Sequence, residues 1–194
     1  MGKVFEQGSF RKYSEIRLDK SRETIRHSAQ YGEKKITVFV SHKHDDLGEL
    51  KGVIGFLEKE YGVSVYIDSR DPSMPLTTSA ITANNLKNRI CECDKFILLA
   101  TNGAIESKWC NWELGFGDAQ KYKAHIALLP LKPEGANDSA YKGSEYMSIY
   151  PYIKYSDGTD RKLSGGCFAK GYYVVTPNGD GATYTLLENW FANK

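Results

Sequence analysis

Trp109 and Glu113 are the two residues of this sequence whose types and spacing best suit chemistry. They follow the apolar run of residues 95–100 and lie four positions apart. Helical residues with this spacing share one face, so the pattern predicts a carboxylate beside an indole. A carboxylate on such a half-apolar wall can stabilise a developing positive charge. The alternative is that Glu113 is an ordinary solvated glutamate, as most glutamates on helices are.

A metal site is the other chemistry that the residue types suggest. Residues 41–46, Ser-His-Lys-His-Asp-Asp, contain the H-x-H-x-D pattern used by binuclear metallohydrolases. The only further histidines are His27 and His125, whereas zinc takes three or four well-placed N, O or S ligands. Cys91 and Cys93 would lie roughly 200° apart around a helix axis, which is a poor arrangement for chelating one ion. We therefore expect no metal and no cofactor.

The elements that would position Trp109 and Glu113 alternate between strands and helices. Apolar runs of strand length predict strands, numbered 1 to 5, at residues 36–40, 63–67, 95–100, 125–131 and 172–175. Apolar positions spaced three and four apart predict helices between them, and a last short helix near residues 186–191. Nearly all-apolar strands that alternate with helices are typical of a parallel sheet covered on both faces. We expect a flavodoxin-like three-layer α/β fold with a five-stranded parallel sheet in the order 2-1-3-4-5.

That strand order places a ligand site at one edge of the sheet. Ligands of such folds bind beyond the carboxyl ends of strands 1 and 3, where the order reverses. Strand 1 ends at Ser41 and strand 3 at residues 101–103, and the next helix brings Trp109 and Glu113 to the same crevice. The loop of residues 69–75 leaves strand 2 and is placed to close over it. Polar groups therefore converge on a small-molecule site.

The length of 194 residues suits one compact domain. Residues 1–34 are predicted to be a polar arm outside the main core, because their apolar positions fit no helical stripe. The domain would then span residues 35–194. Residues from about 133 to 171 are too many for a structureless loop, so we expect extra short elements there, with a lid as the alternative.

Composition excludes several classes of protein. A formal charge of +2 and a pI near 8.2, without a clustered basic stretch, give no indication of nucleic-acid binding. No run approaches the roughly 20 apolar residues of a membrane span, and the start lacks the apolar core of a signal peptide. Four irregularly spaced cysteines do not form a disulfide framework. We therefore expect a cytoplasmic protein with free thiols and no membrane contact.

Residues 35–131 resemble a Toll/interleukin-1 receptor (TIR) domain. Residues 38–42 resemble the first box of the family, although His42 stands where an aromatic residue is usual. Residues 65–75 resemble the second strand of the family and the loop that follows it, which is central to TIR function. Residues 107–114 resemble the segment that holds the catalytic glutamate of enzymatic members. The last helix gives weaker support.

The resemblance implies an enzyme that takes NAD+ as its substrate and cleaves the bond between nicotinamide and ribose. It implies that Glu113 is the catalytic carboxylate and that Trp109 is the neighbouring aromatic wall. The other residues that it places against the nucleotide are Ser41, His42, Lys43, Asp68 and Arg70.

The resemblance further implies a role similar to that of the TIR component of Thoeris-type antiphage defence. Such a protein would make a cyclic ADP-ribose-type nucleotide that diffuses to a separate effector, and it would self-associate through TIR–TIR contacts. Two alternatives stay open at this point. One is a non-enzymatic TIR scaffold that assembles through the loop of residues 69–75. The other is an enzyme like the nucleoside deoxyribosyltransferases, which also place a glutamate near the anomeric carbon of a sugar.

Overall fold

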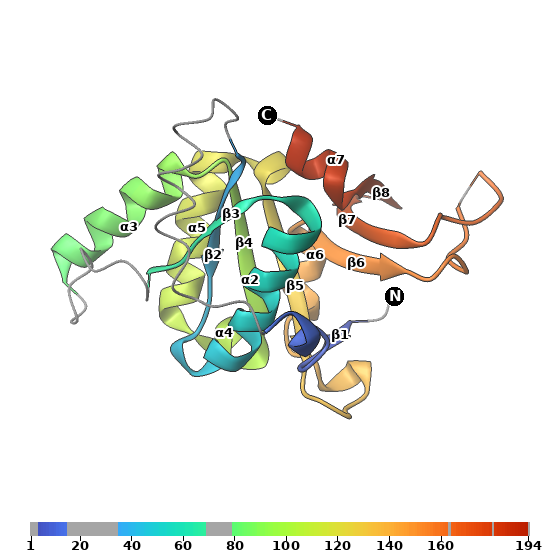
Figure 1. The fold of residues 1–194 in the computed structure, drawn as a ribbon, viewed down its shortest axis with the longest axis horizontal. Helices are drawn as coiled ribbons and strands as arrows, with labels where there is room; N and C mark the ends of the chain where they lie inside the picture. Colours follow the sequence, from blue (N-terminus) through green and yellow to red (C-terminus); the bar gives the residue numbers. More distant parts are fainter. Residues whose placement is uncertain (1–3, 15–34, 69–78, 163, 180, 194) are drawn as a thin grey trace.

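A computed structural model of the chain describes residues 4–14, 35–68, 79–162, 164–179 and 181–193. The described strands form one eight-stranded sheet (Figure 1). Their bounds are β1 Phe5–Glu6, β2 Thr37–Ser41, β3 Ser64–Tyr66, β4 Lys95–Thr101, β5 Ile126–Lys132, β6 Tyr152–Ser156, β7 Gly171–Asn178 and β8 Gly181–Leu186. The described α-helices are α2 Leu47–Tyr61, α3 Ala80–Glu92, α4 Asn102–Glu106, α5 Lys108–Lys121, α6 Ser144–Ile149 and α7 Leu187–Ala192.

The sheet runs in the order β3-β2-β4-β5-β6-β7-β8, and the strands from β3 to β6 are parallel. Helices cover both of its faces, as Figure 1 shows for α2 and α5. One core contains buried residues of α2, α7 and the sheet, and the other contains buried residues of α3, α4, α5 and α6 with the opposite sheet face. This arrangement confirms the expected three-layer α/β fold.

The local sequence explains the helices that border the site edge of the sheet. The predicted strand 1 and the helix after it correspond to β2 and α2, and α2 ends where Gly62 adopts a φ of 64°. Glycine takes that left-handed conformation at no steric cost, so it terminates the helix. Ser79 and Ser107 begin α3 and α5 by accepting hydrogen bonds from the backbone amides of Thr82 and Cys110.

The prediction of the fifth strand was wrong in one respect. The fifth parallel strand is β6, inside the segment from 133 to 171 that was expected to hold extra elements. The run of residues 172–175 belongs to β7, which pairs antiparallel with β6. Parallel neighbours need a long crossover, usually a helix, and no described helix lies between β6 and β7. The hairpin of β7 and β8 then widens the sheet by two antiparallel strands.

The prediction that residues 1–34 lie outside the core was wrong for residues 4–14. Strand β1 pairs in parallel with the end of β5, so that Phe5 faces Leu131 and Glu6 faces Lys132. Phe10 is buried, and its ring lies 4.8 Å from that of Phe56 in α2. Residues 4–14 are mostly polar with isolated aromatic residues, so they give no periodic apolar pattern. The sequence therefore did not reveal this packing. Residues 15–34 lie outside the described part of the chain.

None of the described helices is long and apolar enough to span a bilayer.

Candidate functional site

Glu113 lies in the interior of the protein at the carboxyl edge of the sheet. Its position in α5, six residues after the cap Ser107, turns the side chain towards the sheet, and only 2% of the residue is exposed. The hydroxyl of Ser41, the last residue of β2, donates a hydrogen bond to its Oε2 atom. The interpretation of Glu113 as a solvated surface residue is therefore wrong.

The surroundings of Glu113 favour its protonated form. Burial raises the pKa of this carboxyl to about 8, and the nearby negative charge of Asp68 adds to the shift. Hydrogen bonds from Ser41 and Trp109 oppose the shift by stabilising the carboxylate. A carboxyl with such a displaced pKa, at the edge where this fold binds ligands, is typical of a functional site.

Ser41 and Cys110 connect Glu113 to the end of β2. Cys110 precedes Glu113 by three residues in α5, so the two side chains share one helix face. Its thiol interacts with the hydroxyls of Ser107 and Ser41, and burial raises the pKa of the thiol. Cys110 is thus a neutral neighbour of the Ser41–Glu113 pair.

His42 and Asp68 form the side of the site that is nearest to the end of β3. The Nδ1 atom of His42 lies 3.3 Å from the carbonyl oxygen of Val40 and 3.9 Å from the Oδ1 atom of Asp68. Burial lowers the pKa of His42, although Asp68 opposes this. A neutral imidazole is therefore favoured at neutral pH, and it can position a ligand by hydrogen bonding without adding charge.

Lys43 stands at the open side of the site. Its side chain is partly exposed, and its Nζ atom lies 3.0 Å from the carboxylate of Asp45. The stem of Lys43 passes close to Gly103, where a Cβ atom would lie 3.0 Å from its Cδ atom. The glycine at the start of α4 therefore leaves room for the stem of the lysine.

Asp46 and Thr101 lie at the strand ends where the sequence predicted a site, but the sequence assigned neither a contact with the ligand. The hydroxyl of Thr101, at the end of β4, donates a 2.6 Å hydrogen bond to Asp46 at the start of α2. The same hydroxyl accepts a bond from the amide of Ala104 and so caps α4. Burial raises the pKa of Asp46. The position of Thr101 directly after an apolar strand was the available indication.

Trp109 is half-buried beside Glu113 and begins a row of aromatic rings along α5. Its ring centroid lies 4.9 Å from that of Trp112, with an angle of 22° between the planes, and Trp112 in turn stacks on Phe116. Lys87 of α3 lies over the last two rings. The indole next to the carboxylate is thus held by its neighbours.

The structure brings together Glu113, Ser41, His42, Asp68 and Trp109 from the predicted set and places Lys43 at its margin. Arg70 and the loop of residues 69–75 lie outside the described residues. Within the described part of the chain, no three His, Cys, Asp or Glu side chains are grouped as a metal would require.

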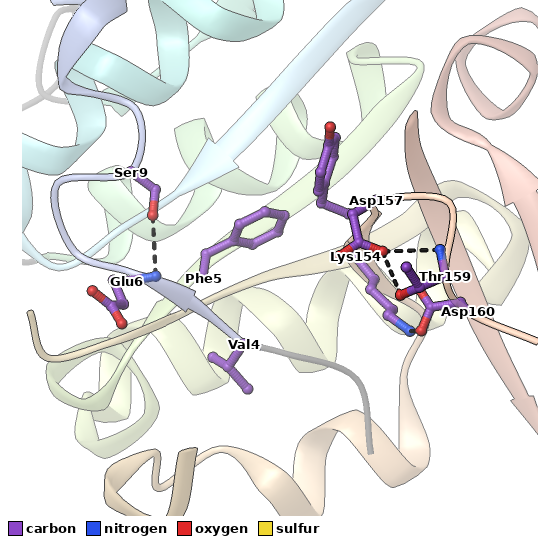
Figure 2. Close-up of a pocket in the computed structure, with 9 residues that line it drawn as sticks. Val4, Phe5, Glu6, Ser9, Lys154, Asp157, Thr159 and Asp160 are labelled. Atoms are coloured by element: carbon purple, nitrogen blue, oxygen red, sulfur yellow. Dashed lines mark hydrogen bonds and ion pairs between the residues drawn. The ribbon is translucent and has the colours of Figure 1, made fainter. Parts of the chain in front are cut away.

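A cavity of about 510 Å³ lies elsewhere, between β1 and the end of β6 (Figure 2). Figure 2 shows the carboxylate of Asp160 beside the ammonium of Lys154, and the two atoms are 2.8 Å apart. Asp157 accepts hydrogen bonds from the amide and hydroxyl of Thr159. None of the described residues predicted for the site lines this cavity, so it is separate from the site at Glu113.

Residues 38–164 match the family described as the TIR domain. Over 126 residues the chain is 33% identical to a protein of Bacillus cereus (strain MSX-D12) named "Probable 3' cyclic ADP-D-ribose synthase ThsB'". That alignment covers 63% of each chain, so this chain spans less than two thirds of the length of its relative. The family match contains β2 except for its first residue, the strands β3 to β6, and every described residue of the site. The chain belongs to the TIR domain family.

Proposed function

We propose that this protein cleaves NAD+ at the nicotinamide–ribose bond and makes a cyclic ADP-ribose-type nucleotide in antiphage defence. The observation that carries the proposal is the buried carboxyl of Glu113, bonded to Ser41 and flanked by Trp109 at the carboxyl edge of the sheet. The name of the Bacillus cereus relative agrees with a cyclase.

Glu113 has the properties that this reaction needs. Nicotinamide leaves as a neutral molecule from a cationic pyridinium, so the sugar that remains resembles an oxocarbenium ion. An ionised carboxylate held in a partly dry crevice stabilises this charge. Because a nearby cation lowers the pKa of a carboxyl, binding of the positively charged nicotinamide ring would itself ionise Glu113.

The fate of the sugar cation determines the product. Attack by water on C1′ gives ADP-ribose, whereas attack by an adenosine group of the same molecule gives a cyclic nucleotide. Our proposal assigns the nucleotide contacts to Ser41, His42, Lys43, Asp68 and Arg70, with Trp109 packed beside the base or ribose. It takes NAD+ as the substrate, needs no cofactor or metal, and includes TIR–TIR self-association and an effector that responds to the product in the cytoplasm.

The substitution Glu113→Gln tests the proposal, because it keeps the shape and removes the charge. The expected result is a loss of nicotinamide release by a factor on the order of 10² to 10³, measured by liquid chromatography with mass spectrometry of the products. Glu106→Gln is the matched control, because Glu106 is exposed in α4 and pairs with Lys142. Equal nicotinamide release by Glu113→Gln and the unchanged protein would remove the proposed mechanism.

Activity of the unchanged protein is a condition of this test. If the unchanged protein releases no nicotinamide at any concentration or with any activating extract, the scaffold alternative replaces the enzyme. Exchange of bases on deoxynucleosides would instead indicate the deoxyribosyltransferase-like alternative.

A further inference from the structure

A second cavity with a different chemistry lies at the far end of the sheet. It has a volume of about 590 Å³, within the usual range for small-molecule sites. Its described lining residues are Arg161, Lys162, Ser164, Phe168, Gly181, Ala182 and Tyr184. Strand β8 is the last of the sheet, six places along the order from β3, whereas Glu113 lies beside β2. Figure 1 shows the β7–β8 hairpin at the opposite end of the molecule from α3.

The wall of this cavity is held by backbone hydrogen bonds. Arg161 and Cys167 form an antiparallel bridge. The amide of Phe168 donates to the carbonyl of Asp160 at 2.9 Å, and the amide of Lys162 donates to that of Gly166 at 3.0 Å. These bonds fix the backbone positions of Arg161, Lys162 and Phe168.

Phe168 and Tyr184 form an aromatic platform in the cavity. Their ring centroids lie 4.2 Å apart with 29° between the planes, so the rings are stacked. The ammonium of Lys162 lies 5.5 Å from the centroid of Phe168. Because Lys162 is exposed, moving its flexible side chain off the ring costs less than stacking a base there returns.

The charge of the cavity is positive. Arg161 and Lys162 are exposed cations, and none of the described lining residues is acidic. Asp160, the nearest acidic neighbour in sequence, already pairs with Lys154 at 2.8 Å. A guanidinium and an ammonium together bind a phosphate well, because the guanidinium offers paired donors and the ammonium a compact charge.

We propose that this cavity, with Arg161, Lys162, Ser164 and Phe168 on one side and β8 on the other, binds a nucleotide, with the base stacked on Phe168 and the phosphate held by Arg161 and Lys162. Lys162 leaves the ring face when the base arrives and turns to the phosphate. Most of this wall follows residue 164, where the match to the TIR family ends. The proposed site shares no described lining residue with the Glu113 site, so it does not depend on the activity proposed for Glu113.

Photolabelling with 8-azidoadenosine 5′-monophosphate, followed by peptide mass spectrometry, tests the proposal on the full chain. The expected label lies in peptides that contain residues 161–184, and it persists in the Glu113→Gln variant. Phe168→Leu, and separately Arg161→Gln combined with Lys162→Gln, are each expected to weaken saturation of that label about tenfold. Phe168→Tyr keeps the ring and Lys51→Gln removes an exposed lysine of α2, so both should retain labelling.

Competition identifies the ligand class. AMP is expected to displace the label at lower concentration than adenosine or inorganic phosphate, because only AMP offers both a base and a phosphate. Equal competition by phosphate alone would make this an anion site and overturn the proposal. Stronger competition by a short single-stranded oligonucleotide would also overturn it in favour of nucleic acid. Labelling confined to peptides that contain residues 41–113 would place nucleotide binding at the Glu113 site only and would overturn the proposal.

Discussion

Glu113 is held between two opposing influences, and their balance decides when it carries a charge. Burial and the charge of Asp68 raise its pKa, whereas hydrogen bonds from Ser41 and Trp109 lower it. Each of these partners comes from a different place: Ser41 from β2, Asp68 from the segment after β3, and Trp109 from the preceding turn of α5. Residues at the end of the sheet and on α5 thus together set the pKa of Glu113.

This balance predicts a pH dependence for nicotinamide release. The free protein holds Glu113 with a pKa of about 8, and the proposed reaction needs the carboxylate. Since kcat/KM follows the ionisation of the free enzyme, it should fall as pH decreases below 8 and level off above it. Ser41→Ala removes a bond that stabilises the carboxylate, so this rise should move to higher pH. A profile that is flat from pH 6 to 9, in both proteins, would contradict the assignment of Glu113.

At the scale of elements, the short N-terminal strand and its following turn belong to the core. Phe10 packs in the interior with rings of α2 and its surroundings, including Phe56 and Phe5. Gly52 of α2 makes this packing possible, because a Cβ atom there would lie 2.6 Å from the carbonyl oxygen of Phe10. The two elements are in contact through backbone as well as side chains.

Phe10→Ala is expected to destabilise the fold by about 3 to 5 kcal/mol, because it removes a fully buried ring and leaves a cavity. Chemical denaturation measures this loss as a shift of the midpoint. Ile81→Ala serves as the control, since Ile81 is 65% exposed in α3 and its loss should change stability by less than about 0.5 kcal/mol. Equal midpoints for Phe10→Ala and the unchanged protein would show that the N-terminal segment is not anchored.

The elements that the sequence predicted best are those with a strong local pattern. Strand β4 is buried along its whole length, and its apolar run by itself predicts a strand. Strand β6 was missed because Lys154 interrupts its apolar pattern, and that buried lysine is paired with Asp160. A tertiary ion pair of this kind has no counterpart in local sequence.

The site was predicted to the extent that topology alone could place it. The order of the parallel strands brought Ser41 and Glu113 to one edge, and they are 72 positions apart in the sequence. The bond between Thr101 and Asp46 depends on side-chain orientation rather than on strand order, so no pattern revealed it. The roles of these residues in catalysis stay predictions.

At the scale of the whole molecule, the fold extends beyond the region that matches the family. The match ends at residue 164, but Val174, Leu187, Trp190 and Phe191 are buried in the same core as α2. Without these side chains, part of the sheet face formed by β5 and β6 would be exposed to solvent. The β7–β8 hairpin and α7 are therefore structural parts of this domain.

A chain that ends at residue 164 is expected to be unfolded or aggregated, because an exposed apolar face and an open strand edge favour association. Circular dichroism and size-exclusion chromatography of the truncated and full chains measure this directly. A truncated monomer with the thermal midpoint of the full chain would contradict the assignment of α7 to the core.

The close contact at Gly52 has a consequence for protein engineering. In a library that randomises position 52, selection for the native fold would favour glycine. Even the methyl group of alanine would clash there with the carbonyl oxygen of Phe10. Survivors with larger residues would have displaced the turn that carries Phe10. Position 52 thus offers a way to detach that turn by a single codon change in α2, with the sequence of residues 4–14 unchanged.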